Sequence, residues 1–430
     1  MKVLVVGGGG REHAIVDSIC REKDAHVFCA PGNAGISQQA EPVNLKAESI
    51  EQILKFVEET EIDLTVVGPE QPLAIGIVDA FSARHKMVFG PSKSAARLET
   101  SKVFAKEFMQ RWRIPTAEFS AFAASQHEDV TRYLAGAKYP LVLKADGLAA
   151  GKGVIIVGSF REALEEIENF FVKRVFGASG ENLVVEEFMT GVEASVFAIT
   201  DGKDYVVLPP AQDHKRVGDN DTGKNTGGMG SFAPTPFVDQ SMMNRIRSEI
   251  IERTIEGTRA EGFPYSGCLY CGIMLTSDGP KVVEFNARFG DPETQAVLQL
   301  IDSSLVELMT ASANGNIAAY RLSVNRSAAV CVIAASGGYP DSYETGKSVE
   351  FLEKAPREIK VFHSGTKFIK GELATSGGRV LGVTGIDAGG SIGNAAALAY
   401  GYLHNLSFEG MFYRKDIGRK AIELESRKGV

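Results

Sequence analysis

The chain has 430 residues, of which 44% are hydrophobic and 23% are charged, and its formal net charge is −8. This length is typical of roughly two to four domains, and the composition is typical of a folded globular protein rather than a disordered one. The acidic balance argues against nucleic acid as a partner, because phosphate backbones are bound by basic surfaces, but small anions stay possible.

No apolar run approaches the roughly 20 residues that span a bilayer, so we expect no membrane contact. The first residues, Met1–Gly10, lack the apolar core of a signal peptide. Five cysteines are spread over the chain, as in a reducing compartment. Cys268 and Cys271 form a Cys-x-x-Cys, for which metal or redox chemistry is one reading and buried, unpaired thiols are the favoured one. We predict a cytoplasmic protein that acts as a monomer.

Residues 1 to about 100 alternate β-branched runs with amphipathic stretches. Strands alternating with helices indicate a doubly wound parallel sheet, whose ligands bind beyond the carboxyl ends of the strands. The predicted strands are 3–6, 26–30, 64–67 and 87–89, and the predicted helices are 12–20, 49–60 and 75–83.

Four glycines, Gly7–Gly10, follow the first predicted strand. They do not match the dinucleotide-binding pattern, because the third glycine position falls on Glu12 and the second strand lacks the acidic residue that binds a ribose. A glycine loop that opens a helix binds phosphate through backbone N–H groups, and Arg11 could add charge-assisted hydrogen bonds. The alternative is a tight turn between strand and helix without a ligand.

A small α+β unit is predicted from about 115 to 187, after a helix at 102–111. It contains Gly151-Lys152-Gly153 between two strands, with Lys144 on the first of them. The spacing from Gly147 and the strand that follows are not those of a P-loop. A glycine-rich flap over phosphates agrees better with the pattern, and a surface hairpin turn is the alternative.

A strand at 184–188 leads out of this unit and includes Glu186 and Glu187. A nucleotide base could lie against its backbone, with Glu193 at the ribose hydroxyls. The alternative is an ordinary half-buried strand with two solvated glutamates. After a hairpin turn at Asp201-Gly202, the polar, glycine-rich stretch 211–236 has little periodicity, and we expect a functional loop there.

Glu284 and Asn286 are two apart on a predicted strand, so both side chains leave the same face. A carboxylate and an amide oxygen suit Mg²⁺ (or Mn²⁺), whose other positions go to phosphates and water. The alternative is a polar strand face without a ligand. Arg288 opens a charged turn, 288–294, and could bind a carboxylate substrate bidentately. Farther on, strands at 328–335 and 379–383 and a helix at 392–404 indicate another domain, which we expect to help close the site.

These motifs together resemble the phosphoribosylamine–glycine ligases (glycinamide ribonucleotide synthetases) of the ATP-grasp superfamily. The segments 211–216, 225–230 and 284–294 are specific to this family rather than to the superfamily. The resemblance covers nearly the whole chain through the stretches 3–14, 90–109, 140–154, 185–193, 208–236 and 265–295. One departure is the strand 269–275, which lacks the acidic metal ligand of many ATP-grasp enzymes.

The resemblance implies an α/β multidomain fold with three parts. These are an N-terminal α/β domain (1–103) with a doubly wound parallel sheet, an ATP-grasp α+β core (104–324) with a small lid subdomain (118–190), and a C-terminal α+β domain (325–430). It also implies ligation of glycine to 5-phosphoribosylamine, with ATP as co-substrate and Mg²⁺ or Mn²⁺ as cofactor. The products would be glycinamide ribonucleotide, ADP and phosphate, formed through glycyl phosphate in purine biosynthesis.

By the same resemblance, the site residues take four roles. ATP would be bound by Lys102, Lys144, Gly151, Lys152, Gly153, Glu186, Glu187 and Glu193. The other substrates would be bound by Gly9, Gly10, Arg11, Glu70, Asp213, Lys215, Asn225, Gly228, Arg288 and Asp291. The metal would be bound by Glu284 and Asn286, and Lys144, Asp213 and Arg288 would take part in catalysis.

Three other functions stay open at this point. The nearest is another ATP-grasp carboxylate–amine ligase or carboxylase that acts on a nucleotide precursor. A nicotinamide-dependent oxidoreductase is suggested by the first 35 residues, but the glycine spacing counts against it. A nucleotide-binding protein without catalytic activity is disfavoured by the lysines and the metal-type strand.

Overall fold

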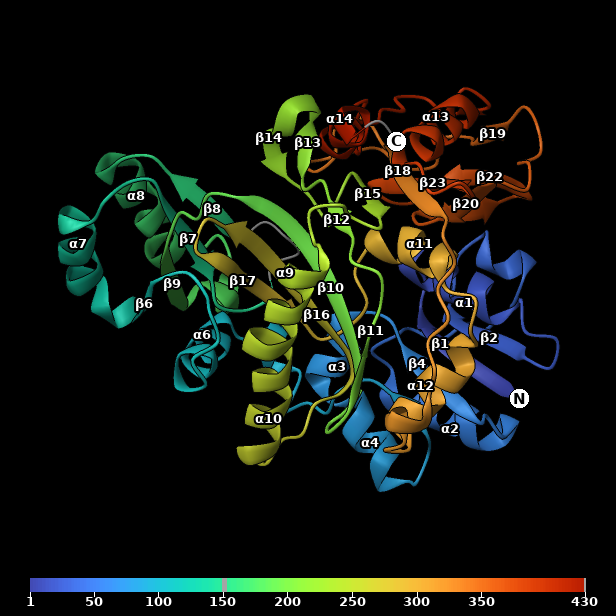
Figure 1. Cartoon of the computed structure of the whole chain (residues 1–430), viewed down its shortest axis with the longest axis horizontal. Helices are drawn as coiled ribbons and strands as arrows, with labels where there is room; N and C mark the ends of the chain where they lie inside the picture. The colour runs from blue at the N-terminus through green and yellow to red at the C-terminus, as the bar shows by residue number, and fades with distance from the viewer. Residues whose placement is uncertain (149–152, 429–430) are drawn as a thin grey trace.

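The computed structural model describes residues 1–148 and 153–428. Gly151 and Lys152, which we expect in the flap, lie outside the described residues. Within the described part, four sheets of four or five strands form the framework of the molecule (Figure 1). No helix in this part combines the length and the apolar character needed to cross a membrane.

The N-terminal sheet is parallel, with the strand order β3-β2-β1-β4-β5. Leu4 and Val6 of β1 pack with α2 and α4, whereas Val3 and Val5 pack with α1, so helices cover both faces. The helix predicted at 75–83 is divided by Gly76, whose φ of 97° ends one helix before the next begins. The elements are β1 (Lys2–Gly7), α1 (Gly10–Ile19), β2 (His26–Pro31), β3 (Glu41–Pro42), α2 (Ile50–Thr60), β4 (Leu64–Val67), α3 (Glu70–Ile75), α4 (Ile77–Ala83) and β5 (Val88–Phe89).

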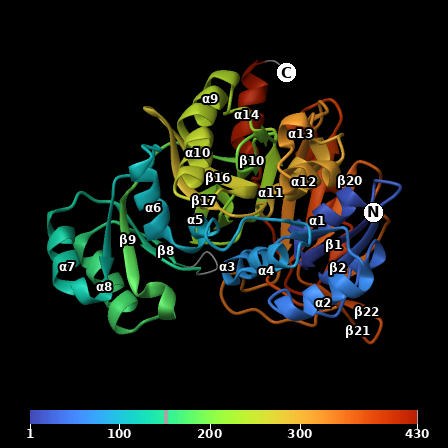
Figure 2. The ribbon, with the colours of Figure 1, turned by 90° about the horizontal axis from the view of Figure 1, so that it is seen from below.

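A second sheet, antiparallel and ordered β6-β9-β7-β8, has a hydrophobic core of its own. Figure 2 shows its helices on the side of the molecule away from the N-terminal sheet. The elements here are α5 (Arg97–Thr100), α6 (Lys102–Arg111), β6 (Phe119–Ala123), α7 (His127–Gly136), β7 (Leu141–Ala145), β8 (Val154–Val157), α8 (Phe160–Ile167) and β9 (Asn182–Glu187).

The central sheet is antiparallel, ordered β11-β10-β16-β17, and lies between two hydrophobic clusters. Cys271 faces the cluster with α9 and α10, and Cys268 faces the other cluster, which includes α12. Both thiols are buried and free, which confirms the favoured reading of the Cys-x-x-Cys. The elements are β10 (Val192–Asp201), β11 (Tyr205–Val207), α9 (Gln240–Ile246), α10 (Glu252–Ala260), β16 (Ser266–Thr276), β17 (Gly279–Asn286), α11 (Glu293–Val297) and α12 (Leu305–Ala313).

The fourth sheet is antiparallel, with the order β12-β15-β18-β23-β20, and differs from expectation. The stretch 211–236, predicted as a loop, contributes four short strands. One of them, β15, pairs with β18, which lies far downstream in the sequence. The sheet therefore joins residues from both sides of position 325, and the domain limits stay a prediction. The elements are β12 (Gln212–Asp213), β13 (Arg216–Gly218), β14 (Thr222–Asn225), β15 (Gly230–Ala233), β18 (Ala328–Ala335), β19 (Glu350–Phe351), β20 (Ile359–His363), β21 (Thr366–Ile369), β22 (Glu372–Thr375), β23 (Arg379–Asp387), α13 (Ile392–Leu403), β24 (Leu406–Ser407) and α14 (Arg419–Lys428).

Two buried histidines join α1 to β20. The His363 backbone N–H donates to Nδ1 of His13 at 2.8 Å, and the two ring centroids are 5.6 Å apart. Burial lowers the pKa of His13 to about 3, with a further contribution from His363, and burial lowers the pKa of His363 to about 4. Asp17 and Lys360, which pair at 3.0 Å beside His13, act on His13 with opposite signs.

This histidine pair predicts a loss of stability in mild acid. The unfolded chain binds protons below about pH 6.5, whereas the folded chain does so only near pH 3 to 4, so stability is complete above pH 6.5 and falls as the pH drops. Between pH 7 and pH 5 each histidine should cost about 2 kcal/mol. Urea unfolding at the two pH values should show a smaller loss for His13→Asn. His127 is exposed, so His127→Asn should lose as much stability between pH 7 and pH 5 as the parent does. If both variants lose the same amount, groups other than His13 cause the pH dependence.

Candidate active site

One cavity of about 1630 Å³ is lined by residues of all four sheets. It opens at the carboxyl end of β1, where a parallel sheet binds its ligands. Gly10 and Gly228 are not among its lining residues, and Gly151 and Lys152 lie outside the described part. The predicted site residues that line it are Gly9, Arg11, Glu70, Lys102, Lys144, Gly153, Glu186, Glu187, Glu193, Asp213, Lys215, Asn225, Glu284, Asn286, Arg288 and Asp291.

Glu284 and Asn286 both reach this cavity from β17. Nζ of Lys215 lies 3.4 Å from Oε1 of Glu284 and 3.7 Å from Oε2 of Glu193. Lys215 lowers the pKa of Glu284 to about 2 against the opposing effect of burial, with help from Lys144 and Lys102. Glu284 is therefore an ionised carboxylate at neutral pH, as a metal ligand must be.

Two buried lysines that line or border this cavity share one carboxylate. Oε2 of Glu186 lies 2.9 Å from Nζ of Lys144 and 3.1 Å from Nζ of Lys106. Nζ of Lys144 also donates to the Val283 carbonyl at 3.1 Å. Burial, only partly offset by Glu186, lowers the pKa of Lys106 to about 8. Two ammonium groups on one carboxylate leave this region net positive, which favours a bound polyphosphate.

Lys102 and Glu187 flank this positive region. Nζ of Lys102 donates to the Gly147 carbonyl at 3.1 Å, and burial lowers the pKa of Lys102. Glu187 pairs with Lys281 at 3.1 Å, and its side chain is 38% exposed. Oε2 of Glu186 is thus bound to two protein lysines, whereas its buried Oε1 has no hydrogen-bond partner in the described part of the chain, and Glu187 is paired with Lys281.

Asp213 lies at the start of the loop, where Oδ1 accepts a hydrogen bond from the His214 backbone N–H at 2.6 Å. Burial raises the pKa of Asp213 well above its ordinary value, and the nearby Glu293 raises it further. Glu293 is itself buried and accepts from the Ser195 hydroxyl at 2.8 Å. Two carboxyl groups in one buried place favour a cation between them.

Arg288 connects the central sheet to the N-terminal part of the chain. Its Nη2 lies 2.9 Å from Oε1 of Glu99, and its Nε lies 3.3 Å from Oε2 of Glu70. Its Nη1 donates to the Phe289 carbonyl at 3.2 Å. Of these three contacts, only the one with the Phe289 carbonyl is a hydrogen bond, and the buried Nε has no hydrogen-bond partner among the described residues, so N–H donors of this guanidinium remain for a substrate carboxylate.

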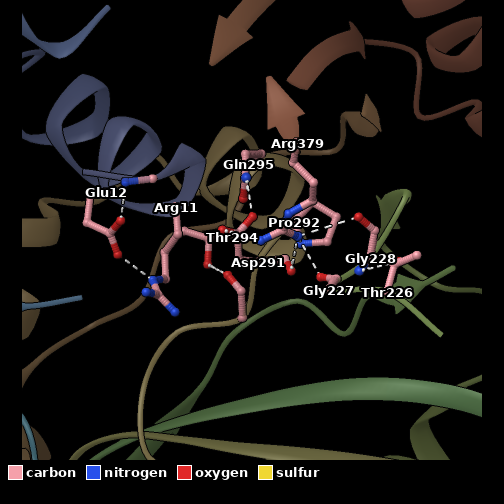
Figure 3. A network of polar contacts seen from close by, with 12 residues as sticks. Arg11, Glu12, Thr226, Gly227, Gly228, Asp291, Pro292, Thr294, Gln295 and Arg379 are labelled. Atoms are coloured by element: carbon pink, nitrogen blue, oxygen red, sulfur yellow. Dashed lines mark hydrogen bonds and ion pairs between the residues drawn. The ribbon is translucent and has the colours of Figure 1, made fainter. Parts of the chain in front are cut away.

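The glycine loop after β1 is occupied by a protein carboxylate. Glu12 accepts a hydrogen bond from the Gly9 backbone N–H at 2.6 Å, and its other oxygen lies 2.5 Å from Nε of Arg11. Nη1 of Arg11 donates to the Phe289 carbonyl at 3.2 Å. Figure 3 shows Arg11 and Glu12 turned toward each other. A phosphate at this loop would have to compete with Glu12 for the same donors.

Gly228 could not be another residue. Its φ is 107°, and a Cβ atom there would meet Pro292 and the carboxylate of Asp213. Gly228 thus sets the close approach of the 226–228 loop to Asp213 and to the turn at Asp291-Pro292, rather than lining the cavity itself. Asn225 lies on β14, where it pairs with Arg216.

Models of three phosphoribosylglycinamide synthetase domains match this chain in order. The N domain matches residues 1–99, the ATP-grasp (A) domain matches 100–294 and the C domain matches 329–420. The chain belongs to the phosphoribosylglycinamide synthetase family. The family and the fold class that the sequence predicts are both confirmed.

Relatives of similar length support this membership. The phosphoribosylamine–glycine ligase of Caldanaerobacter subterraneus subsp. tengcongensis is 48% identical over 97% of this chain and 99% of its own. That of Vibrio vulnificus is 43% identical over 100% of both chains. The crystal structure of phosphoribosylamine–glycine ligase from Thermotoga maritima has a TM-score of 0.84 at 34% identity, over 97% of this chain and 100% of that one.

A biotin carboxylase domain from Hydrogenobacter thermophilus shares the fold alone, with a TM-score of 0.75 at 17% identity over 96% of this chain and 91% of that one. Among residues 1–148 and 153–428, no three His, Cys, Asp or Glu side chains gather as a metal site. Glu284 and Asn286 offer a carboxylate and an amide oxygen, a donor pair that fits a metal whose other ligands are phosphates and water.

Several residues of the site were not predicted from the sequence. Lys106, Glu99 and Arg379 contact predicted site residues, and Glu293 acts on the charge of Asp213; all four line the cavity and are mostly buried. Lys106 and Glu99 occupy buried positions of α6 and α5, and no sequence motif marks either of them. Glu293 lies within the charged turn 288–294. The sequence analysis noted the charge of this turn but did not assign a site role to Glu293.

Proposed function

We propose that this protein ligates glycine to 5-phosphoribosylamine at the expense of ATP. The products are glycinamide ribonucleotide, ADP and phosphate, and the reaction passes through glycyl phosphate. The observation that carries the proposal is the meeting in one cavity of the loop 211–230, the lysines of the ATP-grasp core and the strand with Glu284 and Asn286. Family membership over the whole chain supports the same conclusion.

ATP would bind between the second and the central sheets. Lys102 and Lys144 would face the phosphates, together with the flap of Gly151, Lys152 and Gly153. Glu186 would serve as the counter-charge that holds Lys144, and the β9 backbone at Glu187 would take the base. Glu193, whose side chain is 44% exposed, would take the ribose hydroxyls.

Glu284 and Asn286 would hold Mg²⁺ or Mn²⁺, which would neutralise negative charge on the phosphates of ATP. Lys215 stands beside Glu284 and balances its charge. When a divalent cation binds, Lys215 still has Glu193 as a partner, at 3.7 Å. The lysine would lose its contact with Glu284 in this exchange, and its ammonium donors would then turn to a phosphate or to a substrate carbonyl oxygen.

Glycine would bind between Asp213 and Arg288. The amino group of glycine supplies the cation that the buried Asp213 and Glu293 favour, and the remaining donors of Arg288 suit its carboxylate. A carboxylate oxygen so held attacks the γ-phosphate, and the sugar amine then displaces phosphate from the acyl group. Exclusion of water by the flap protects the acyl phosphate from hydrolysis.

5-Phosphoribosylamine would bind at the carboxyl end of β1. Gly9, Gly10 and Arg11 would contact its phosphate, which would displace Glu12 from the Gly9 N–H. The sugar would be recognised from the surrounding residues Glu70, Asn225 and Asp291, and Gly228 would set the approach of the 226–228 loop. We further propose a cytoplasmic monomer.

Phosphate release by the purified protein with Mg-ATP tests this function. Glycine and 5-phosphoribosylamine are omitted in turn, and the amine is generated in the cuvette from ribose 5-phosphate and ammonia. Release should need both substrates, and the product should carry glycine in an amide bond to the sugar amine. Release that needs neither, or that follows bicarbonate instead of the amine, would replace the ligase with an ATPase or a carboxylase.

A further inference from the structure

One arginine of the fourth sheet contacts two segments of the site, the 226–228 loop and the turn at Asp291-Pro292. Arg379 is the first residue of β23, and its side chain is 19% exposed. Its Nη1 donates to the carbonyls of Gly227 at 2.5 Å and of Asp291 at 2.9 Å, and its Nη2 lies 2.9 Å from Oδ2 of Asp291. Figure 3 shows the guanidinium between the 226–228 loop and the turn at Asp291-Pro292.

Asp291 is fixed on both oxygens. Gln295 Nε2 donates to Oδ1 at 2.8 Å, while Arg379 holds Oδ2. Burial alone would raise the pKa of Asp291, but Arg379 and Arg11 together keep it below its ordinary value. A Cβ atom on Gly9 would lie 3.6 Å from Oδ2 of Asp291, so this carboxylate stands over the glycine loop. It lines the cavity as an ionised acceptor.

Other contacts from the C-terminal part of the chain hold the same loop. The Gly227 backbone N–H donates to the Tyr339 hydroxyl at 3.1 Å, and Lys224 pairs with Asp341 at 2.8 Å. Arg379 differs from these because it alone, among the contacts named here, touches the loop and Asp291 at once. Its donors are directed at protein oxygens, which suits a role in positioning rather than in binding substrate.

The segments that Arg379 joins lie beside the glycine loop and not beside the ATP lysines. Asp291 is a neighbour of Gly9 and Arg11, whereas Lys102 and Lys144 contact Gly147, Val283 and Glu186. A change at Arg379 should therefore weaken binding of the ligand at the carboxyl end of β1 more than binding of the nucleotide.

We propose that Arg379 is a positioning residue for the sugar-amine substrate, which holds Asp291 and the 226–228 backbone in the geometry that receives it. The C-terminal part of the chain thereby sets the affinity for that substrate. This inference rests on the proposed function, since it names the substrate whose binding Arg379 supports.

Arg379→Met and Arg379→Lys test the role by steady-state kinetics. Arg379→Met should raise the KM for 5-phosphoribosylamine about 10- to 100-fold, the usual effect of losing hydrogen bonds to a charged group, and change the KM for ATP less than about twofold. Arg379→Lys should recover part of the loss, because one ammonium reaches Asp291 but does not replace the planar fork. Guanidinium ion added to Arg379→Ala should restore part of the activity.

The pH profile gives a second readout that a merely structural role would not move. Because Arg379 lowers the pKa of Asp291, its removal raises that pKa, and the acid limb of kcat/KM for the sugar amine should shift to higher pH. Asp291→Asn, which keeps the shape of the side chain, should remove this limb. If Arg379→Met does not fold, Arg379→Lys and Asp291→Asn still decide the question.

Lys360→Met is the matched control. Lys360 lies on β20 of the same sheet and pairs with Asp17 of α1 at 3.0 Å, outside the cavity. This variant should leave all KM values unchanged. An equal rise of every KM in the Arg379 variants, or no rise in any, would overturn the inference. Absence of amine-dependent turnover in the parent enzyme would instead overturn the proposed function.

Discussion

Replacement of Glu284 by glutamine should lower Mg²⁺-dependent turnover about 100- to 1000-fold, with the fold unchanged. Glu284 is the ionised member of the Glu284–Asn286 pair, since Lys215 and the other nearby lysines lower its pKa to about 2. Glutamine keeps the shape and one oxygen but loses the charge that a divalent cation requires. Turnover is measured against Mg²⁺ concentration, and Mn²⁺ binding in the presence of ADP is measured by electron paramagnetic resonance.

Two further variants separate loss of the metal from loss of the lysine contact. Asn286→Asp adds a carboxylate on the same face of β17 and should keep or increase Mn²⁺ affinity. Glu372→Gln, at the exposed first residue of β22, should change neither turnover nor Mn²⁺ binding. If Glu284→Gln binds Mn²⁺ as the parent does, then Glu284 pairs only with Lys215 and the metal lies elsewhere.

Local patterns were sufficient to predict the elements whose order depends on neighbouring residues. The parallel sheet follows from short β-branched runs separated by amphipathic stretches, and the shared face of Glu284 and Asn286 follows from the strand period of two. The interruption of the helix predicted at 75–83 depends on the positive φ of Gly76, which is tolerated or avoided according to tertiary packing.

Long-range pairing explains what the sequence did not predict. The strands within 211–236 are two to four residues long, and β15 forms because β18 offers it an edge. Short strands of this kind carry no periodicity of their own. Arg379 and Glu99 carry no motif either, since their partners Asp291 and Arg288 lie far from them in sequence.

Some predicted site residues have charged partners in the structure that the sequence did not indicate. Arg11 and Lys144 were expected to offer free positive charge to phosphates, but Glu12 and Glu186 contact them in the structure. The sequence indicates which residues carry charge, whereas the charge left for a ligand depends on the counter-ions that folding brings beside them. Their proposed ligand roles therefore require an exchange of partners on binding.

Replacement of Arg288 by methionine should abolish turnover and also destabilise the fold by about 3 to 5 kcal/mol, because a buried carboxylate loses its partner. That carboxylate belongs to Glu99, which lies 2.9 Å from Arg288 and is 7% exposed. Burial raises the pKa of Glu99, so protonation offsets part of the loss at low pH. The deficit should thus be larger at pH 8 than at pH 6, as measured by urea unfolding.

The double variant Arg288→Met/Glu99→Gln distinguishes a structural from a catalytic role of the arginine. A neutral glutamine removes the unpaired charge and still accepts the Ala287 N–H, which Glu99 binds at 2.6 Å. Stability should therefore recover in part, since replacing both partners of a buried pair is often nearly neutral but Glu70 also loses its contact with Arg288. Turnover should not return, because the guanidinium donors proposed for the glycine carboxylate are still missing. If activity recovers together with stability, Arg288 only joins the N-terminal part of the chain to the central sheet, and another cation must hold the glycine carboxylate.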